Sequence, residues 1–157
     1  MKSTLLAGAL GILVIGSAPA IHGQHKQPLQ QPNSEAAAVV PAGELALGTV
    51  RVPNGVKADG KPLPGGTYKV RLTAQEAAGK APGATPSYER YVEFLQGTEV
   101  KGREVVSIVP SADISKVAKD KGPAPGAARV QRLRGDDYVR VWINRGGNHY
   151  LIHLVAG

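Results

Sequence analysis

The stretch YVRVWINRGGNHYLIHLVA, residues 138–156, decides the fold class of this chain. Apolar residues alternate with other types on both sides of Gly146-Gly147, and a period of two is typical of β-strands. A two-residue turn at the glycines, which tolerate a positive φ, fixes how the two strands pair. Three apolar pairs then share one face: Val139 with Leu154, Val141 with Ile152, and Ile143 with Tyr150. The stretch therefore predicts a β-hairpin with one face in a core.

The opposite face of this hairpin is our candidate binding face. It combines the only tryptophan of the chain with cationic, amide and aromatic side chains, which stack on sugars or hydrogen-bond to partners. Its members are Tyr138, Arg140, Trp142, Asn144, His149, Leu151 and His153. Arg129, Arg132 and Arg145 would add a basic rim. In the alternative interpretation a second sheet or a long loop covers this face, and Trp142 and Leu151 are core residues.

Short strands are expected along the rest of the chain, divided by clusters of Gly, Pro, Asp and Asn. The clearest is residues 66–73, GTYKVRLT, in which Tyr68, Val70 and Leu72 share one face. The others expected are residues 45–52, 91–95, 100–109 and 130–133. This pattern is typical of antiparallel sandwiches. The chain is therefore predicted to be all-β, an antiparallel β-sandwich of immunoglobulin or transthyretin-like type with about seven strands.

Parts of this strand pattern stay open. Neither a two-residue nor a three-residue turn between residues 91–95 and 100–109 pairs all the apolar positions. Val130 and Leu133 have opposite parity, so either a bulge separates them or one of them points outward. Two long connections remain, residues 74–87 and 110–128. The second contains SADISKVAK at 111–119, which predicts at most one short capped helix.

Composition limits the classes of protein to which the chain can belong. Its 157 residues allow one domain. The 20 glycines and 12 prolines are too many for a helical bundle, whereas a hydrophobic content of 42% excludes a fully disordered chain. There is no cysteine, so no disulfide and no lipid anchor on cysteine is expected. Apolar burial must therefore supply the folding energy.

The N-terminal segment predicts export. Residues 1–20 have a positive charge at Lys2, an apolar run, and Ala18-Pro19-Ala20 as an A-x-A cleavage site, the pattern of a signal peptide. The apolar run is far shorter than the roughly 20 residues that span a bilayer. Residues 21–43, rich in Gln, Pro and Ala, predict a flexible leader, and residues 44–157 a single β-sandwich domain. We expect a periplasmic or secreted protein with no membrane span after cleavage.

Turn residues near the start of the predicted domain carry a resemblance. Gly48-Thr49-Val50, followed by DGKPLPGGTYKV at 59–70, resembles the G-x-V…D-G-x-P-L-x-G opening of carboxypeptidase-regulatory-like, transthyretin-type sandwiches. The same stretch is similar to the L-P-x-G-T-Y strand entry of small exported bacterial β-sandwich proteins of unknown function. It departs from the first pattern by the longer insertion at 53–58. The resemblance implies a non-catalytic sandwich and assigns no functional residues.

No arrangement of residues predicts catalysis. Nucleophilic catalysis needs a Ser or Cys beside a base, and the chain has no Cys and no G-x-S-x-G motif. His149 and His153 share a strand face, but four residues separate them by roughly 13 Å, too far for one metal ion. The carboxylates Glu89, Glu93, Glu99 and Glu104 are expected on a solvated strand face. We therefore predict no catalytic residue, no metal and no cofactor. The alternative is a small secreted hydrolase or metal-dependent enzyme.

Charge indicates the class of partner. The formal net charge is +7 and the isoelectric point is about 9.8, so polyanions are natural partners. We expect a binding or structural module for a polyanion, a glycan or an envelope protein. Nucleic acid is not expected, because an aromatic content of 4% does not supply stacking platforms for bases.

Overall fold

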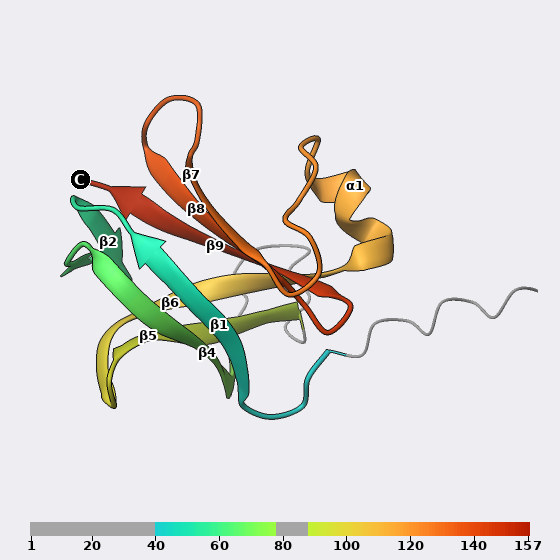
Figure 1. The fold of residues 1–157 in the computed structure, drawn as a ribbon, viewed down its shortest axis with the longest axis horizontal. Helices are drawn as coiled ribbons and strands as arrows, with labels where there is room; N and C mark the ends of the chain where they lie inside the picture. The colour runs from blue at the N-terminus through green and yellow to red at the C-terminus, as the bar shows by residue number, and fades with distance from the viewer. Residues whose placement is uncertain (1–39, 78–87) are drawn as a thin grey trace, which may run out of the picture. The chain divides into compact units, whose positions relative to one another are not determined.

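The computed structural model describes residues 40–77 and 88–157 of the chain (Figure 1). The predicted signal peptide, residues 21–39 of the predicted leader, and residues 78–87 of the first predicted connection lie outside this part. Export and cleavage therefore stay predictions.

Antiparallel strands make up most of the described chain. They are β1 (Leu45–Val52), β2 (Val56–Ala58), β3 (Lys61–Leu63), β4 (Gly66–Glu76), β5 (Glu89–Gln96), β6 (Glu99–Pro110), β7 (Ala128–Arg132), β8 (Tyr138–Arg145) and β9 (Asn148–Ala156). The predicted all-β class is confirmed. The strand count was too low, because the Gly-, Pro- and Asp-rich segment before β4 forms the short hairpin β2–β3 in addition to its turns.

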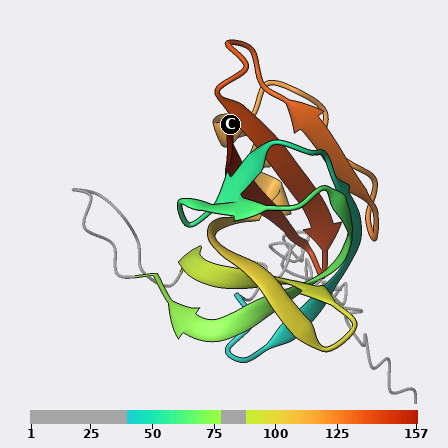
Figure 2. The ribbon, with the colours of Figure 1, turned by 90° about the vertical axis from the view of Figure 1, so that its left-hand side faces the viewer.

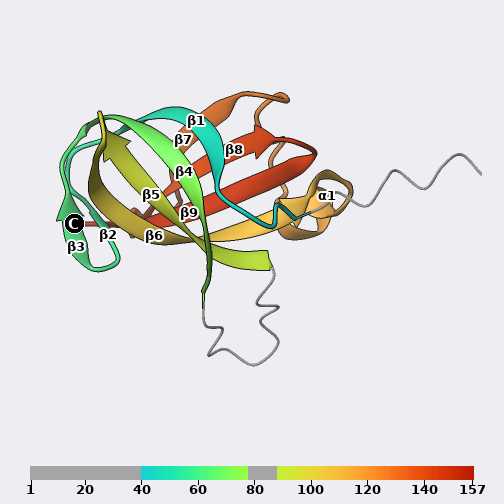
Figure 3. The same ribbon diagram turned by 90° about the horizontal axis from the view of Figure 1, so that it is seen from below.

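The strands form one strongly curved, open sheet. Its order runs β1-β4-β5-β6-β9, and the other edge of β9 continues to β8 and then β7. The β2–β3 hairpin joins the end of β9, at Val56 and Lys57. Figures 2 and 3 show the sheet curling so that β1 returns beside β7 and β8. No ladder joins β1 to β7 among the described strands, although their Cα atoms come within 8 Å.

The β8–β9 hairpin has the predicted register. Val139 pairs with Leu154 and Ile143 with Tyr150, so every pair deduced from the sequence is present. Gly146 and Gly147 have φ of 60° and 76°, the left-handed conformation that a two-residue turn of this kind requires.

The two open points of the strand pattern have local explanations. The register between β5 and β6 shifts at a bulge, since Phe94 pairs with Gly102 and Leu95 with Val100. This bulge is why no simple turn satisfied the apolar pattern. At β7, Val130 packs against the core, whereas Leu133 lies beyond the end of the strand.

A single apolar core fills the inside of the curved sheet. It is made of alternate residues from all strands except β7, which contributes the partly buried Val130. Among the largest fully buried side chains facing it are Leu47, Tyr68, Leu72, Phe94, Ile143, Tyr150, Ile152 and Leu154. The two halves of one continuous sheet therefore enclose the core in the way that two sheets do in a sandwich.

One arginine is buried on the inner side of the sheet. Arg90 of β5 is 3% exposed, and its Nε donates a hydrogen bond of 2.9 Å to the carbonyl of Thr73. Its other guanidinium nitrogens donate to the carbonyls of Pro41 and Gly43. Arg90 thus fixes the segment that enters β1, and its donors find backbone acceptors instead of a carboxylate.

Between β6 and β7 the chain crosses the outside of the sheet. This segment, residues 111–127, is called the strap below. It begins with a 3-10 turn, η2 (Ser111–Asp113), and one helical turn, α1 (Ile114–Val117). The predicted short helix is present, but neither turn has a side-chain cap. The rest of the strap is irregular and leads into β7.

Candidate functional site

The seven residues of the candidate binding face do lie on one face of the β8–β9 hairpin. Their cross-strand pairs are Arg140 with His153, Trp142 with Leu151, Asn144 with His149, and Tyr138 with Val155. The face is divided into a covered and an open half. Trp142, Leu151, Asn144 and His149 are buried, whereas Tyr138 and His153 are exposed and Arg140 is intermediate.

The covered half is a small second core beneath the strap. Trp142 is fully buried, and it packs with Leu151 and Val109 of the sheet and with Ile114 and Ala118 of the strap. The expectation that this half contacts a ligand is therefore corrected. For Trp142 and Leu151 the structure agrees with the alternative interpretation, in which a long loop covers the face and these two side chains are core residues.

Trp142 and His149 are joined inside this second core. The indole Nε1 donates a hydrogen bond of 2.8 Å to Nδ1 of His149, and the two rings meet edge to face. Nδ1 must therefore be unprotonated, which places the single proton of the neutral imidazole on Nε2. Burial lowers the pKa of His149 and so favours this neutral form.

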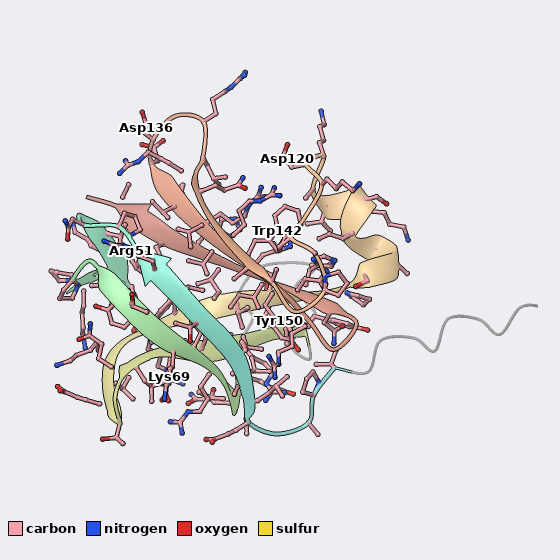
Figure 4. All side chains as sticks on the ribbon, viewed as in Figure 1. Arg51, Lys69, Asp120, Asp136, Trp142 and Tyr150 are labelled. Carbon is pink, nitrogen blue, oxygen red and sulfur yellow. The ribbon has the colours of Figure 1, made fainter. Side chains whose placement is uncertain are left out.

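The strap is fixed to the hairpin at several points. The side chain of Asn144 donates to the carbonyl of Pro123 at 3.0 Å, and the amide of Gly126 donates to the carbonyl of Asn144 at 2.7 Å. Gly122 lies directly on Trp142, since a Cβ built there would be 2.6 Å from the indole ring. Figure 4 shows Trp142 between the hairpin and the strap, which carries Asp120.

The open half of the face is cationic and aromatic. Tyr138 and Val155 are 46% and 41% exposed and lie opposite each other. The guanidinium of Arg140 stacks 4.6 Å from the centre of the Trp142 ring and reaches Asp120 at 3.4 Å. Partial desolvation and the charge of Arg140 lower the pKa of His153. The open half is therefore smaller than the predicted face.

The predicted basic rim is not one structure. Arg129 donates to the carbonyl of Lys121 at 2.8 Å and so helps to hold the strap. Arg132 lies at the end of β7, 3.9 Å from a carboxylate oxygen of Asp136, and Arg145 lies at the far end of β8. The three arginines therefore lie at different parts of the surface and do not form one basic rim.

A groove lies along the seam between β1 and β7, the two edge strands that approach each other without pairing. This seam groove encloses about 380 Å³ between the end of β1 and the facing part of β7 and β8. It is lined by Arg51, Val52, Pro53, Val130, Gln131, Arg132 and Val139. Its apolar residues are continuous with the core, and its two charged residues are both arginines. An anionic group would find cations there and no lining carboxylate.

A second groove lies on the other side of β1. It encloses about 400 Å³ and is lined by Ala46, Gly48, Thr49, Lys69, Val70, Arg71, Leu95 and Arg145. Its charged residues are again cations, but Arg71 is already paired with Glu93 at 2.6 Å and with Glu44 at 3.5 Å. These contacts raise the pKa of Arg71. Arg71 is therefore less available to an anionic ligand than Arg51 of the seam groove is, whereas Lys69 and Arg145 form none of the ion pairs of the described residues.

Sequence reasoning singled out Arg132 but not Arg51, and it did not join them. The seam groove brings together strands from opposite ends of the domain, β1 and β7. Neither strand contains a sequence motif that predicts its approach to the other. The groove is therefore visible only in the three-dimensional structure.

Three of the four carboxylates considered for catalysis take part in other contacts. Glu93 pairs with Arg71, Glu99 with Lys101 at 2.7 Å, and Glu104 accepts from the amide of Asp59 at 2.7 Å. In residues 40–77 and 88–157, no three His, Cys, Asp or Glu side chains gather as metal ligands would. None of the helices in these ranges has the length and hydrophobicity of a membrane span.

Comparison with known proteins found no matching family model, no similar curated protein and no similar solved structure. The resemblance carried by residues 48–70 therefore stays a prediction.

Proposed function

We propose that this chain is an exported, non-catalytic binding module that holds an anionic polymer along the seam groove. The observation that carries the proposal is the lining of this groove, which combines an apolar floor with two arginines and no acidic residue. Arginine binds carboxylate and phosphate groups through two parallel hydrogen bonds. The formal net charge is +7 for the whole chain and +6 once residues 1–20, with Lys2, are removed, and it would draw such a ligand to the protein.

The guanidinium groups of the two groove arginines are available to bind an anionic ligand. The guanidinium of Arg51 forms none of the side-chain hydrogen bonds or ion pairs of the described residues. That of Arg132 has only the exposed Asp136, with a carboxylate oxygen at 3.9 Å and a long hydrogen bond of 3.4 Å to the carbonyl of the same residue. Contacts of this kind contribute little in water. A ligand anion can therefore replace them at small cost.

The ligand would lie over the seam instead of adding a strand within it. One strand inserted between two others holds them about 9.6 Å apart, which is twice the usual strand spacing. The Cα atoms of β1 and β7 already approach within 8 Å, so this space is occupied. Recognition would then depend on side chains and charge, which suits a flexible anionic polymer.

Export rests on the predicted signal peptide at residues 1–20. Mass spectrometry of the protein recovered outside the cytoplasm would show a mature N-terminus at Ile21. A full-length chain retained in the cytoplasm would contradict this part of the proposal.

Binding is tested with two polymers of different chemistry, poly-L-glutamate and inorganic polyphosphate. We expect one or both to bind in calorimetry, with an affinity that falls as salt is added. The double variant Arg51→Gln/Arg132→Gln should bind at least about tenfold more weakly, the equivalent of about 1.4 kcal/mol.

The matched control is Lys61→Gln/Lys119→Gln, which removes the same charge at two exposed positions outside the groove. An equal loss in this control would mean that only the net charge matters, and the seam groove would be rejected as the site. The proposal would also fail if neither polymer bound the unmodified protein at low salt.

A further inference from the structure

The contact between Trp142 and His149 has a property that a purely structural hydrogen bond lacks. It exists only while His149 is neutral, because a protonated imidazole has hydrogens on both nitrogens and no acceptor. The indole Nε1–H would then face a second donor inside a buried space. One proton therefore converts a favourable contact into a repulsive one.

We propose that His149 is a pH-sensitive latch, whose protonation lifts the middle of the strap from the β8–β9 hairpin and exposes Trp142. The strap lies against both rings, since a Cβ built on Gly122 would be 2.6 Å from the indole and 3.2 Å from Cε1 of His149. A charged imidazole needs water or an acceptor, and the strap is the element that excludes water from it.

The charged surroundings provide no compensation for the imidazolium. The charged or titratable side chains on the elements around His149 are Asp113, Lys116, Lys119, Asp120 and Lys121 on the strap, Glu99, Lys101, Arg103 and Glu104 on β6, Arg129 and Arg132 on β7, Tyr138, Arg140 and Arg145 on β8, and Tyr150 and His153 on β9. From β6 the residue opposite His149 is the apolar Val109. Both strap carboxylates already have partners, because Asp113 pairs with Lys116 and Asp120 with Arg140. None of the ion pairs in the described chain includes His149.

The bonds that fix the strap define which part moves. Its first residue is held by the amide of Ser111, which donates to the carbonyl of Gly147 at 3.0 Å. Its last residues are held by the backbone bonds of Gly126 and Ala127 to Asn144. The middle is held by the packing of Ile114, Ala118 and Gly122 and by three polar contacts of side chains on β7 and β8. These contacts are the hydrogen bonds from Asn144 to Pro123 and from Arg129 to Lys121, and the ion pair of Arg140 with Asp120. Opening is therefore expected between the two fixed ends.

The direction of the pH effect follows from linkage. Burial lowers the pKa of His149 in the closed state, whereas an opened strap would return it toward its ordinary value near 6.5. Below that value, each pH unit favours the open state by up to about tenfold, until the closed state also binds the proton. The latch is closed in neutral solution and opens in acid.

The chain provides its own probe, since Trp142 is its only tryptophan. On lowering the pH from about 8 to about 5, we expect the emission of Trp142 to shift to the red and its quenching by acrylamide to increase severalfold. Far-ultraviolet circular dichroism should stay that of the folded sheet, because the core is not involved.

The decisive variant is His149→Gln, which keeps an acceptor for the indole but cannot titrate. It should hold Trp142 shielded at both pH values, whereas the control His153→Gln should retain the transition. A wild-type protein that stays folded without change in Trp142, or a transition that persists in His149→Gln, would overturn the proposal.

A second measurement does not depend on any variant. Hydrogen exchange of the folded wild-type protein, corrected for its intrinsic pH dependence, should show reduced protection of strap amides in acid while the β5 and β6 amides keep theirs. Uniform loss of protection in both regions would indicate global unfolding and would also overturn the latch. Polyanion binding at the seam groove is a separate measurement, and its outcome does not decide this one.

Discussion

The two faces of the β8–β9 hairpin differ in how they are buried. The inner face, which includes Val141 and Ile152, joins a core to which every strand contributes. The outer face carries Trp142 and Leu151, which are buried by a short irregular strap. The inner face is therefore buried by the fold itself, whereas the outer face is buried by a segment that can move while the sheet stays intact.

Truncation of neighbouring residues on the two faces should give the largest effect. Ile152 and Leu151 are adjacent in β9, both are buried, and they point to opposite faces. Ile152→Ala should lower the free energy of unfolding by about 4 kcal/mol, because the surrounding core cannot collapse into the cavity. Leu151→Ala should lower it by only about 2 kcal/mol, since the strap can settle into the space.

Urea unfolding followed by circular dichroism measures both values. Equal losses for the two variants would mean that the strap is as rigid as the sheet. The distinction between the two faces would then be wrong.

The same distinction decides how much could be predicted from the sequence. Alternation along residues 138–156 gave the register of the hairpin and its inner face correctly, because both strands and their turn are local. The burial of Trp142 depends on residues 111–127, which precede β7 and are therefore not adjacent to the hairpin in the sequence. Period-two alternation shows that Trp142 and Leu151 share a face, but it cannot show what covers that face.

The β2–β3 hairpin and the seam groove were missed for related reasons. Each strand of that hairpin has only three residues, too few for alternation to be visible between Gly, Pro and Asp. The seam groove depends on how far the sheet curls, which is set by the twist and bulges of many strands together. No single segment contains that information.

A side chain at Gly122 should separate the strap from the outer face. In Gly122→Ala the new methyl group would overlap the rigid indole of Trp142, so the strap must lift. We expect a loss of about 2 kcal/mol, typical of overpacking, and Trp142 fluorescence already shifted to the red at neutral pH.

The control is Gly126→Ala, in the same strap, where the new Cβ meets no neighbour but φ is +80°. It should be strained in its backbone without exposing Trp142. An unshifted emission in Gly122→Ala would contradict the packing of the strap on the indole.

Removal of one hydrogen bond between the strap and the hairpin should have a smaller effect. Asn144→Ala leaves the carbonyl of Pro123 without its donor at 3.0 Å. The expected loss is about 1 to 2 kcal/mol, since part of the strap can open to let water reach this carbonyl. Hydrogen exchange should place the lost protection in the strap rather than in β5 or β6. Equal loss throughout the sheet would mean that the outer face unfolds only together with the inner one.

The pH dependence of stability should give the smallest effect. Burial lowers the pKa of His149, and partial desolvation together with the charge of Arg140 lowers that of His153. Between these lowered values and the ordinary pKa near 6.5, the unfolded chain binds protons that the folded chain does not, so stability falls as the pH falls. Above about pH 7.5 the two histidines contribute no slope.

Urea midpoints measured from pH 8 to pH 5 test this sign and its origin. We expect a loss of less than about 1.4 kcal/mol per pH unit for each histidine, which is the limit for one proton. His149→Gln should remove its share of the slope, and His153→Gln should remove the rest. A slope that survives in His149→Gln/His153→Gln would place the titrating groups on the carboxylates. An unchanged slope in His149→Gln alone would mean that His149 binds its proton equally well in the folded and unfolded chains. The outer face would then not desolvate His149, and the burial of this side chain beneath the strap would be contradicted.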